Sequence, residues 1–390
     1  MMNTQKRVGE RFDWTLAFIL FLFFIVSCIS ISSAQTSGQY STNFVVMQIA
    51  WYVVGGIIIG MSILLDPDQY RKLAWYLYGF GILLLILLIF APESIAEPRN
   101  GAKSWFTLPG IGSIQPSEFM KTFLILATSR LIVDHHQKYI YKTVKTDGLL
   151  LFKIIGVSFI PLALIMQQPD LGTGLVIVAI TIGLIFVSGI TWKIILPAFS
   201  IFAITAGTIL SMAIWKPEVI DKFVDDYQFG RIYSWLDPYS YQTKEGFHLI
   251  KSLQAIGSGE ITGKGYNSWE VDVPERHTDF IFSVIGEEFG FIGSSIVISL
   301  YFLLIYHLIK VALDTKSQFN AYLCAGIISM TTFHVFQNIG MTVGLLPITG
   351  IPLPFISYGG SSLMGNMLAL GIIFSIRFYH RNYMFSTNND

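Results

Sequence analysis

The sequence contains little cysteine and little charge. Only two of its 390 residues are cysteine, and both, Cys28 and Cys324, lie inside apolar runs. A disulfide framework or a thiolate metal site needs more cysteines at characteristic spacings, so both are excluded. Charged residues make up 13% of the chain and hydrophobic residues 53%. This composition is far more apolar than that of an ordinary globular protein, and it predicts a chain whose natural solvent is lipid.

Motifs for nucleotide binding are also missing. The sequence has no Gly-x-x-x-x-Gly-Lys loop, dinucleotide fingerprint or zinc-ligand spacing. It therefore offers no support for ATP-driven or nicotinamide chemistry, and we expect no nucleotide cofactor. The formal net charge of +0 gives no indication of a nucleic-acid partner.

Ten apolar runs are long enough to cross a hydrocarbon core, which takes about 20 residues per helix. They are residues 14–34, 43–65, 74–92, 115–133, 150–166, 171–188, 192–214, 280–308, 319–343 and 356–378. The first run imitates a signal peptide, but many spans follow it, so we interpret it as an uncleaved transmembrane helix. The fold class we expect is an all-α polytopic membrane protein, a single integral membrane domain over residues 1–390.

Basic residues fall mainly on alternate loops. With an inner N-terminus, 15 of the 25 Lys and Arg residues lie on inner segments and three on short outer loops or their edges. Short loops rich in positive charge stay in the cytoplasm. The pattern therefore predicts that both termini are cytoplasmic, and it places nearly all polar Gly- and Pro-containing segments on the outer face.

One outer segment, residues 214–280, is much longer than the others. It is rich in aromatic residues, which disordered spacers lack, and Trp and Tyr favour the level of the lipid headgroups. Apolar residues recur at helical spacing around residues 219–227 and 247–253. We expect two amphipathic helices at the membrane interface, with a flexible connector as the alternative.

The end of this loop, Val273–Phe280, holds ionisable residues close to lipid, where such groups usually face a cavity or a partner. Asp279 can act as a general base toward a substrate hydroxyl or hold a divalent cation. An Asp directly before a helix is also a preferred N-cap. The residue alone leaves catalysis and capping equally open.

Other ionisable residues also admit two interpretations. Glu287 and Glu288 lie two turns into the next span, where the proton path of a transporter would look the same. Glu118 and Lys121 are three residues apart, which predicts an ion pair on one helix face. A polar face of the ninth span predicts interhelical hydrogen bonds and consists of His334, Gln337 and Asn338.

Six motifs in order resemble the SEDS family (shape, elongation, division and sporulation), and most closely its RodA and FtsW members. They are Gly101–Trp105, Gln115–Glu118, Pro169–Thr173, Ala255–Gly259, Pro274–Phe282 and Pro347–Phe355. The resemblance covers residues 14–378. It implies a ten-helix glycosyltransferase that polymerises lipid II into peptidoglycan at the outer face of the bacterial cytoplasmic membrane, with a class B penicillin-binding protein as its transpeptidase partner.

The resemblance also implies site residues, with Asp279 as the catalytic aspartate. Residues expected to bind substrate are Lys103, Trp105, Glu118, Lys121, Asp170, Arg231, Arg276 and His277. A cationic side chain or a divalent cation, Mg²⁺ or Mn²⁺, is expected to offset the charge of the leaving pyrophosphate. The short termini favour a RodA-like role in elongation over an FtsW-like role in division. A lipid II flippase and a non-catalytic scaffold of the cell-wall machinery are the alternatives.

Overall fold

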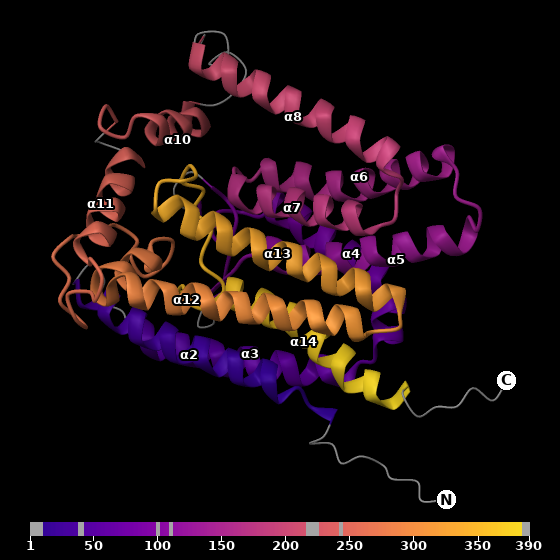
Figure 1. Ribbon diagram of the computed structural model, residues 1–390, viewed down its shortest axis with the longest axis horizontal. Helices are drawn as coiled ribbons and strands as arrows, with labels where there is room; N and C mark the ends of the chain where they lie inside the picture. Colours follow the sequence, from indigo (N-terminus) through magenta and orange to yellow (C-terminus); the bar gives the residue numbers. More distant parts are fainter. Residues whose placement is uncertain are drawn as a thin grey trace, which may run out of the picture.

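The computed structural model describes residues 11–37, 43–98, 102–108, 112–215, 226–241 and 245–383. These residues form a bundle of long helices, and the described part contains one short β-hairpin (Figure 1). The helices are α2 (Trp14–Ala34), α3 (Phe44–Leu64), α4 (Pro67–Phe90), α5 (Pro116–Lys138), α6 (Val144–Met166), α7 (Leu171–Val187), α8 (Trp192–Trp215), α10 (Asp226–Leu236), α11 (Glu245–Ser258), α12 (Ile281–Asp314), α13 (Gln318–Thr342) and α14 (Gly360–Tyr383), with the 3-10 turn η1 (Gln35–Ser37). The strands β1 (Phe106–Leu108) and β2 (Gly112–Ile114) pair antiparallel.

Each of the ten predicted spans coincides with a helix of the bundle. Seven of the described helices are long and apolar enough to cross a membrane, and they are α2, α3, α4, α6, α12, α13 and α14. The apolar stretches of α7 and α8 are shorter. Helix boundaries follow local signals: Asp66 and Gln69 form a capping box at the start of α4, with Pro67 at its first position. The chain is a multi-pass α-helical membrane protein, as its composition predicted.

The start of α2 and the end of α14 lie at the same end of the bundle, while α10 and α11 lie at the opposite end (Figure 1). Ionic contacts join the helices at the first of these ends. Asp13, which caps α2, lies 2.8 Å from the Nε2 atom of His307 near the end of α12. Arg377 on α14 donates to Asp314 at 3.0 Å. Placement of this end in the cytoplasm remains a prediction from charge.

The long outer segment forms helices that dock on the bundle. The second predicted amphipathic helix is confirmed as α11, whose Ser252 hydroxyl donates to the Thr342 carbonyl at 2.8 Å. The first predicted amphipathic stretch lies mostly outside the described residues, which resume with α10 at Asp226. Trp235 of α10 donates its indole N–H to the Gly344 carbonyl at 2.9 Å. Both helices are therefore tied to the C-terminal end of α13.

Glycines let the segment after α11 pack into a break in α12. Gly290 has φ of 60° and ψ of −155°, so the helix is interrupted there. The Lys264 amide donates to the freed Glu287 carbonyl at 3.1 Å. A Cβ atom on Gly263, which has φ of 80°, would collide with the Glu288 carbonyl. Only glycine permits this approach, and the pairing satisfies backbone groups that lipid cannot.

Candidate active site

A tight turn, Glu275–Phe280, carries the proposed catalytic aspartate. Its first residue has a positive φ of 50°, which is a strained conformation for a side chain other than glycine. Neighbouring elements hold the turn by its carbonyl groups. The Tyr358 amide donates to the His277 carbonyl at 2.9 Å, and the Asn338 side-chain amide donates to the Asp279 carbonyl at 2.8 Å. The backbone of Asp279 is therefore fixed by α13 and by the loop before α14.

Asp279 does not cap α12. The cap position belongs to Phe280, and no side-chain hydrogen bond is made there. The interpretation of Asp279 as the N-cap of α12, which the residue alone left open, is therefore wrong. Its carboxylate is left available for another role.

Charged groups from three parts of the chain converge on the Asp279 carboxylate. Desolvation by the surrounding protein, together with the negative charges of Glu275 and Asp170, raises its pKa from 3.8 to about 7, while the Arg231 charge acts in the opposite direction. The side chain keeps some accessible surface. Space beside it depends on Gly350, since a Cβ atom at that position would lie 3.4 Å from Oδ2 of the aspartate. A carboxyl group with this pKa can exchange a proton at neutral pH, as a general base must.

Asp170 links two further outer turns to this site. It caps α7, with Oδ1 accepting from the Thr173 amide at 3.0 Å. Its Oδ2 atom accepts from the Gln115 side-chain amide at 2.8 Å, at the start of α5. Local capping chemistry thus fixes the ends of α5 and α7 against each other, and Asp170 acts electrostatically on Asp279 from that position.

Lys103 and Trp105 lie in the segment between α4 and the hairpin. The Lys103 ammonium donates to the carbonyls of Ala91 and Ile89 and so closes the end of α4. Trp105 is half-buried. The adjoining Ser104 hydroxyl donates to the Gln168 carbonyl at 3.1 Å, which places this segment beside the turn that leads to Asp170. Arg99 and Gly101 lie outside the described residues.

Glu118 and Lys121 form the predicted ion pair. The Lys121 ammonium lies 2.8 Å from a Glu118 carboxylate oxygen, and the residues are only 2% and 4% exposed. The same ammonium lies 3.0 Å from Nε2 of His334, whose Nδ1 donates to the Met330 carbonyl. The polar face of α13 therefore makes the predicted interhelical contacts. Both charged groups are engaged within the bundle, and their binding of substrate remains a prediction.

Arg276 and His277 are both buried in the protein. The His277 ring stacks on Phe44 with centroids 4.4 Å apart, and burial lowers the pKa of the imidazole, so it is neutral at pH 7. Arg276 is buried, with its guanidinium 4.6 Å from the Trp269 ring centroid. Their direct contact with substrate is not supported by these positions.

Sequence reasoning missed Glu275 as a site residue. Its charge is the largest Coulombic influence on the Asp279 pKa. The only sequence signal was its spacing, four residues before Asp279 in the same motif. Gln115 lies in one of the six motifs but was not expected to be a site residue, because its contact with Asp170 depends on tertiary packing.

The site was tested for a divalent cation. Among the described residues, no group of three or more His, Cys, Asp or Glu side chains converges closely enough to hold a metal ion. Carboxylates at long range from one another do not form the oxygen cage that Mg²⁺ or Mn²⁺ requires.

The electrostatic arrangement predicts opposite pH shifts for two variants. If Asp279 acts as an unprotonated base, activity rises with pH and is half-maximal near pH 7. Glu275→Gln removes a negative charge and should move this midpoint to lower pH, whereas Arg231→Gln removes a positive charge and should move it to higher pH. The measurement is the pH dependence of the turnover rate. Midpoints that coincide in the three proteins would contradict the assignment.

Comparisons with known proteins cover nearly the whole chain. A family model described as "Cell cycle protein", for FtsW, RodA and SpoVE, matches residues 10–382. The peptidoglycan glycosyltransferase MrdB of Escherichia coli K12 is 34% identical over 373 residues, which are 95% of this chain and 94% of that protein. Stage V sporulation protein E of Bacillus subtilis is 30% identical over 385 residues, covering 97% of this chain and all of the relative.

Two solved structures of similar proteins also match nearly the whole chain. A structure described as "Structural coordination of polymerization and crosslinking by a peptidoglycan synthase complex" matches with a TM-score of 0.77 and 26% identity, covering 96% of this chain and 99% of that one. The crystal structure of the rod shape determining protein RodA of Thermus thermophilus matches with a TM-score of 0.67 and 26% identity, covering 95% and 97%. The similarity extends over the bundle and the outer loops alike.

Proposed function

The chain belongs to the cell cycle protein family of FtsW, RodA and SpoVE, and we propose that it is a peptidoglycan glycosyltransferase with Asp279 as its catalytic base. One observation carries the assignment of the site. A carboxylate with a pKa of about 7 lies where the loops before α7, α12 and α14 meet. Among the described residues outside the spans, no other ionisable side chain combines such a pKa with a position in one of the six motifs.

The proposed reaction joins two lipid-linked disaccharides. A sugar hydroxyl of the acceptor attacks the anomeric carbon of the donor, a new C–O bond forms, and the bond from that carbon to the polyprenyl pyrophosphate breaks. Asp279 takes the hydroxyl proton, and the pyrophosphate leaves with the electron pair of the broken bond. Arg231 is the cation of the site and is proposed to offset the developing negative charge.

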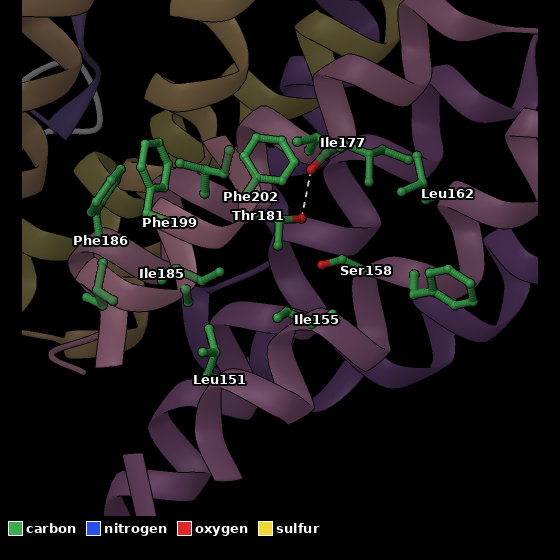
Figure 2. Close-up of a pocket in the computed structure, with 15 residues that line it drawn as sticks. Leu151, Ile155, Ser158, Leu162, Ile177, Thr181, Ile185, Phe186, Phe199 and Phe202 are labelled. Atoms are coloured by element: carbon green, nitrogen blue, oxygen red, sulfur yellow. Dashed lines mark hydrogen bonds between the residues drawn. The ribbon is translucent and has the colours of Figure 1, made fainter. Parts of the chain in front are cut away.

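An apolar groove supports a substrate that stays in the bilayer. A cavity of about 260 Å³ lies between α6, α7 and α8, and Figure 2 shows its lining, which includes Leu162, Ile177, Thr181 and Phe202. In Figure 1, α8 stands apart from α6 and α7. Ile177 lies two helical turns below Asp170, so the groove begins beneath the polar site. We propose that it accepts the polyprenyl chain while the sugars reach Asp279.

Filling the groove should weaken binding of long-tailed substrate. Ala198 lines the cavity, and Ala198→Trp would occupy space that the lipid chain needs. Excluding two buried methylene groups costs about 1.6 kcal/mol, so KM for lipid II should rise about tenfold. Short-tailed lipid II should be unaffected. Ile204→Trp, on the opposite, exposed face of the same helix and outside the cavity lining, is the control. An equal KM in both variants would remove the groove from the binding site.

The partner and the setting are also proposed. A class B penicillin-binding protein is the proposed transpeptidase partner, supported by the match to a complex that coordinates polymerization and crosslinking. A divalent cation, Mg²⁺ or Mn²⁺, is proposed to arrive with the pyrophosphate, since the described residues hold no group of three or more His, Cys, Asp or Glu side chains placed to bind one. The active face is proposed to be the outer face of the cytoplasmic membrane, with a RodA-like role in elongation.

The function is tested by adding purified lipid II to the protein and its partner in vesicles. Glycan strands are the expected product. Movement of labelled lipid II across the bilayer without strand formation would instead support a flippase, and neither activity would support a scaffold.

A further inference from the structure

The most unusual buried cation in the described part of the chain is Arg276. It is only 1% exposed, and its Nε and both terminal nitrogens have no hydrogen-bond partner among the described residues. Its guanidinium carbon lies 4.6 Å from the centroid of the Trp269 ring. Buried charges without partners are costly and rare, so this one needs a physical explanation.

Two buried carboxylates provide the counterpart. Glu287 and Glu288, on the first two turns of α12, are both completely buried. Each uses one oxygen and leaves the other without a partner in the described structure. Oε1 of Glu287 accepts from the amides of Glu270 and Val271, at 2.8 and 3.0 Å. Oε1 of Glu288 accepts from the Ser33 hydroxyl at the end of α2.

Arg276 interacts electrostatically with Glu287 and Glu288 without a direct hydrogen bond to either. The negative charges of Glu287 and Glu288, and of Asp272, favour the charged form of Arg276 against its desolvation, which lowers the pKa of the guanidinium. Hydrogen bonds do not join the cation to either carboxylate. The guanidinium nitrogens and one oxygen of each carboxylate are buried without hydrogen-bond partners among the described residues. Buried water molecules, each making two to four hydrogen bonds, commonly connect such groups.

We propose that Arg276, Glu287 and Glu288 form a water-bridged ionic cluster that positions the Glu275–Phe280 turn, and that Arg276 is a positioning residue rather than a ligand of the pyrophosphate. This inference rests on the proposed function of Asp279.

The connectivity explains how the cluster acts. Arg276 lies inside the turn, three residues before Asp279. Glu287 accepts hydrogen bonds from the amides of Glu270 and Val271, in the segment that leads into the turn. Helix α12 begins two residues after Asp279. The cluster therefore ties the segment before the turn to the helix after it. The charges that shift the pKa of Asp279 are those of Glu275, Arg231 and Asp170, so Arg276 acts on its position rather than on its proton affinity.

The cluster also bears on the transport alternative. A proton path needs carboxylates that exchange protons with both sides of the membrane. Glu287 instead accepts two backbone hydrogen bonds and one from Lys264, as a fixed structural anchor does.

Kinetics of the full-length protein with lipid II test the proposal. Arg276→Gln should lower kcat about 100-fold, the effect of a misplacement of about 1 Å, and leave KM unchanged. The pH midpoint of activity should also stay at its wild-type value, unlike that of Arg231→Gln. Arg276→Lys, which keeps the charge, should recover most of the rate. An increase in KM at constant kcat would identify Arg276 as a substrate ligand and overturn the proposal.

Hydrogen–deuterium exchange provides a readout that does not depend on activity. The amides of Glu270 and Val271 should exchange faster in Arg276→Gln and in Glu287→Gln, because the carboxylate that holds them loses one of its two cationic neighbours or its own charge. Asp237→Asn, on the exposed end of α10, should leave them unchanged. Unchanged exchange in Arg276→Gln would overturn the cluster. Absence of glycan strands from the wild-type protein would instead reject the proposed function, while the exchange result would still decide the cluster.

Discussion

Replacing Lys121 with methionine is expected to lower the free energy of unfolding by about 3 to 5 kcal/mol, the cost of breaking a buried ion pair. Lys121 and Glu118 are almost completely buried with charged atoms 2.8 Å apart, and the ammonium also contacts His334. Removal of the cation leaves the Glu118 carboxylate without its counterion between α5 and α13. The loss is measurable as a shift in reversible unfolding of the purified protein in mixed micelles.

The double variant Glu118→Gln/Lys121→Met separates pairing from packing. It removes both charges and keeps side chains of similar volume, so most of the lost stability should return. If the single and double variants are equally unstable, the pair contributes through packing alone. Full stability of Lys121→Met would contradict the buried ion pair.

Replacing Asp279 with asparagine is expected to lower the rate of glycan polymerisation by about 10² to 10⁴-fold, the usual contribution of a general base. The substitution keeps the size of the side chain and removes only its ability to accept a proton. The fold should be unaffected. Because the pKa of Asp279 is raised in the folded protein, its ionisation opposes folding above pH 7, so asparagine removes no stabilising charge.

Two controls accompany this variant. Asp237→Asn changes an exposed aspartate just after α10. Among the described hydrogen bonds, the Asp237 carboxylate accepts only from Ser240, so this variant should keep full activity. At neutral pH and above, Asp279→Asn should be at least as thermally stable as the wild type, because it removes a carboxylate whose ionisation opposes folding. A fully folded Asp279→Asn protein that polymerises lipid II at the wild-type rate would remove the aspartate from the mechanism.

Most of the bundle could be predicted from the sequence. Length and apolarity are sufficient for a transmembrane helix, because lipid forces every backbone group to pair within the helix. The break in α12 could not be predicted. It depends on the close approach of Gly263 and its neighbours from another segment, and periodicity along one helix carries no such information. The start of α14 was also misplaced, since residues 356–359 form a loop that holds the His277 carbonyl.

The candidate site was predictable only in part. The residue alone left Asp279 open to two interpretations, and the family resemblance favoured catalysis. The structure excludes the capping role, because Phe280 occupies the cap position. The ion pair followed from spacing on a single helix. Arg276 looked like a substrate cation because its charge was visible in the sequence, whereas its burial against Trp269 and its acidic surroundings depend on tertiary packing.

The protonation of Asp279 is the most direct test of the account. Infrared difference spectra of the wild type against Asp279→Asn, recorded in vesicles across pH 4 to 9, isolate the carbonyl stretch of this one carboxylic acid. We expect a protonated carboxyl band that disappears with a midpoint near pH 7. A band that is already lost near pH 4, the ordinary value for aspartate, would contradict it.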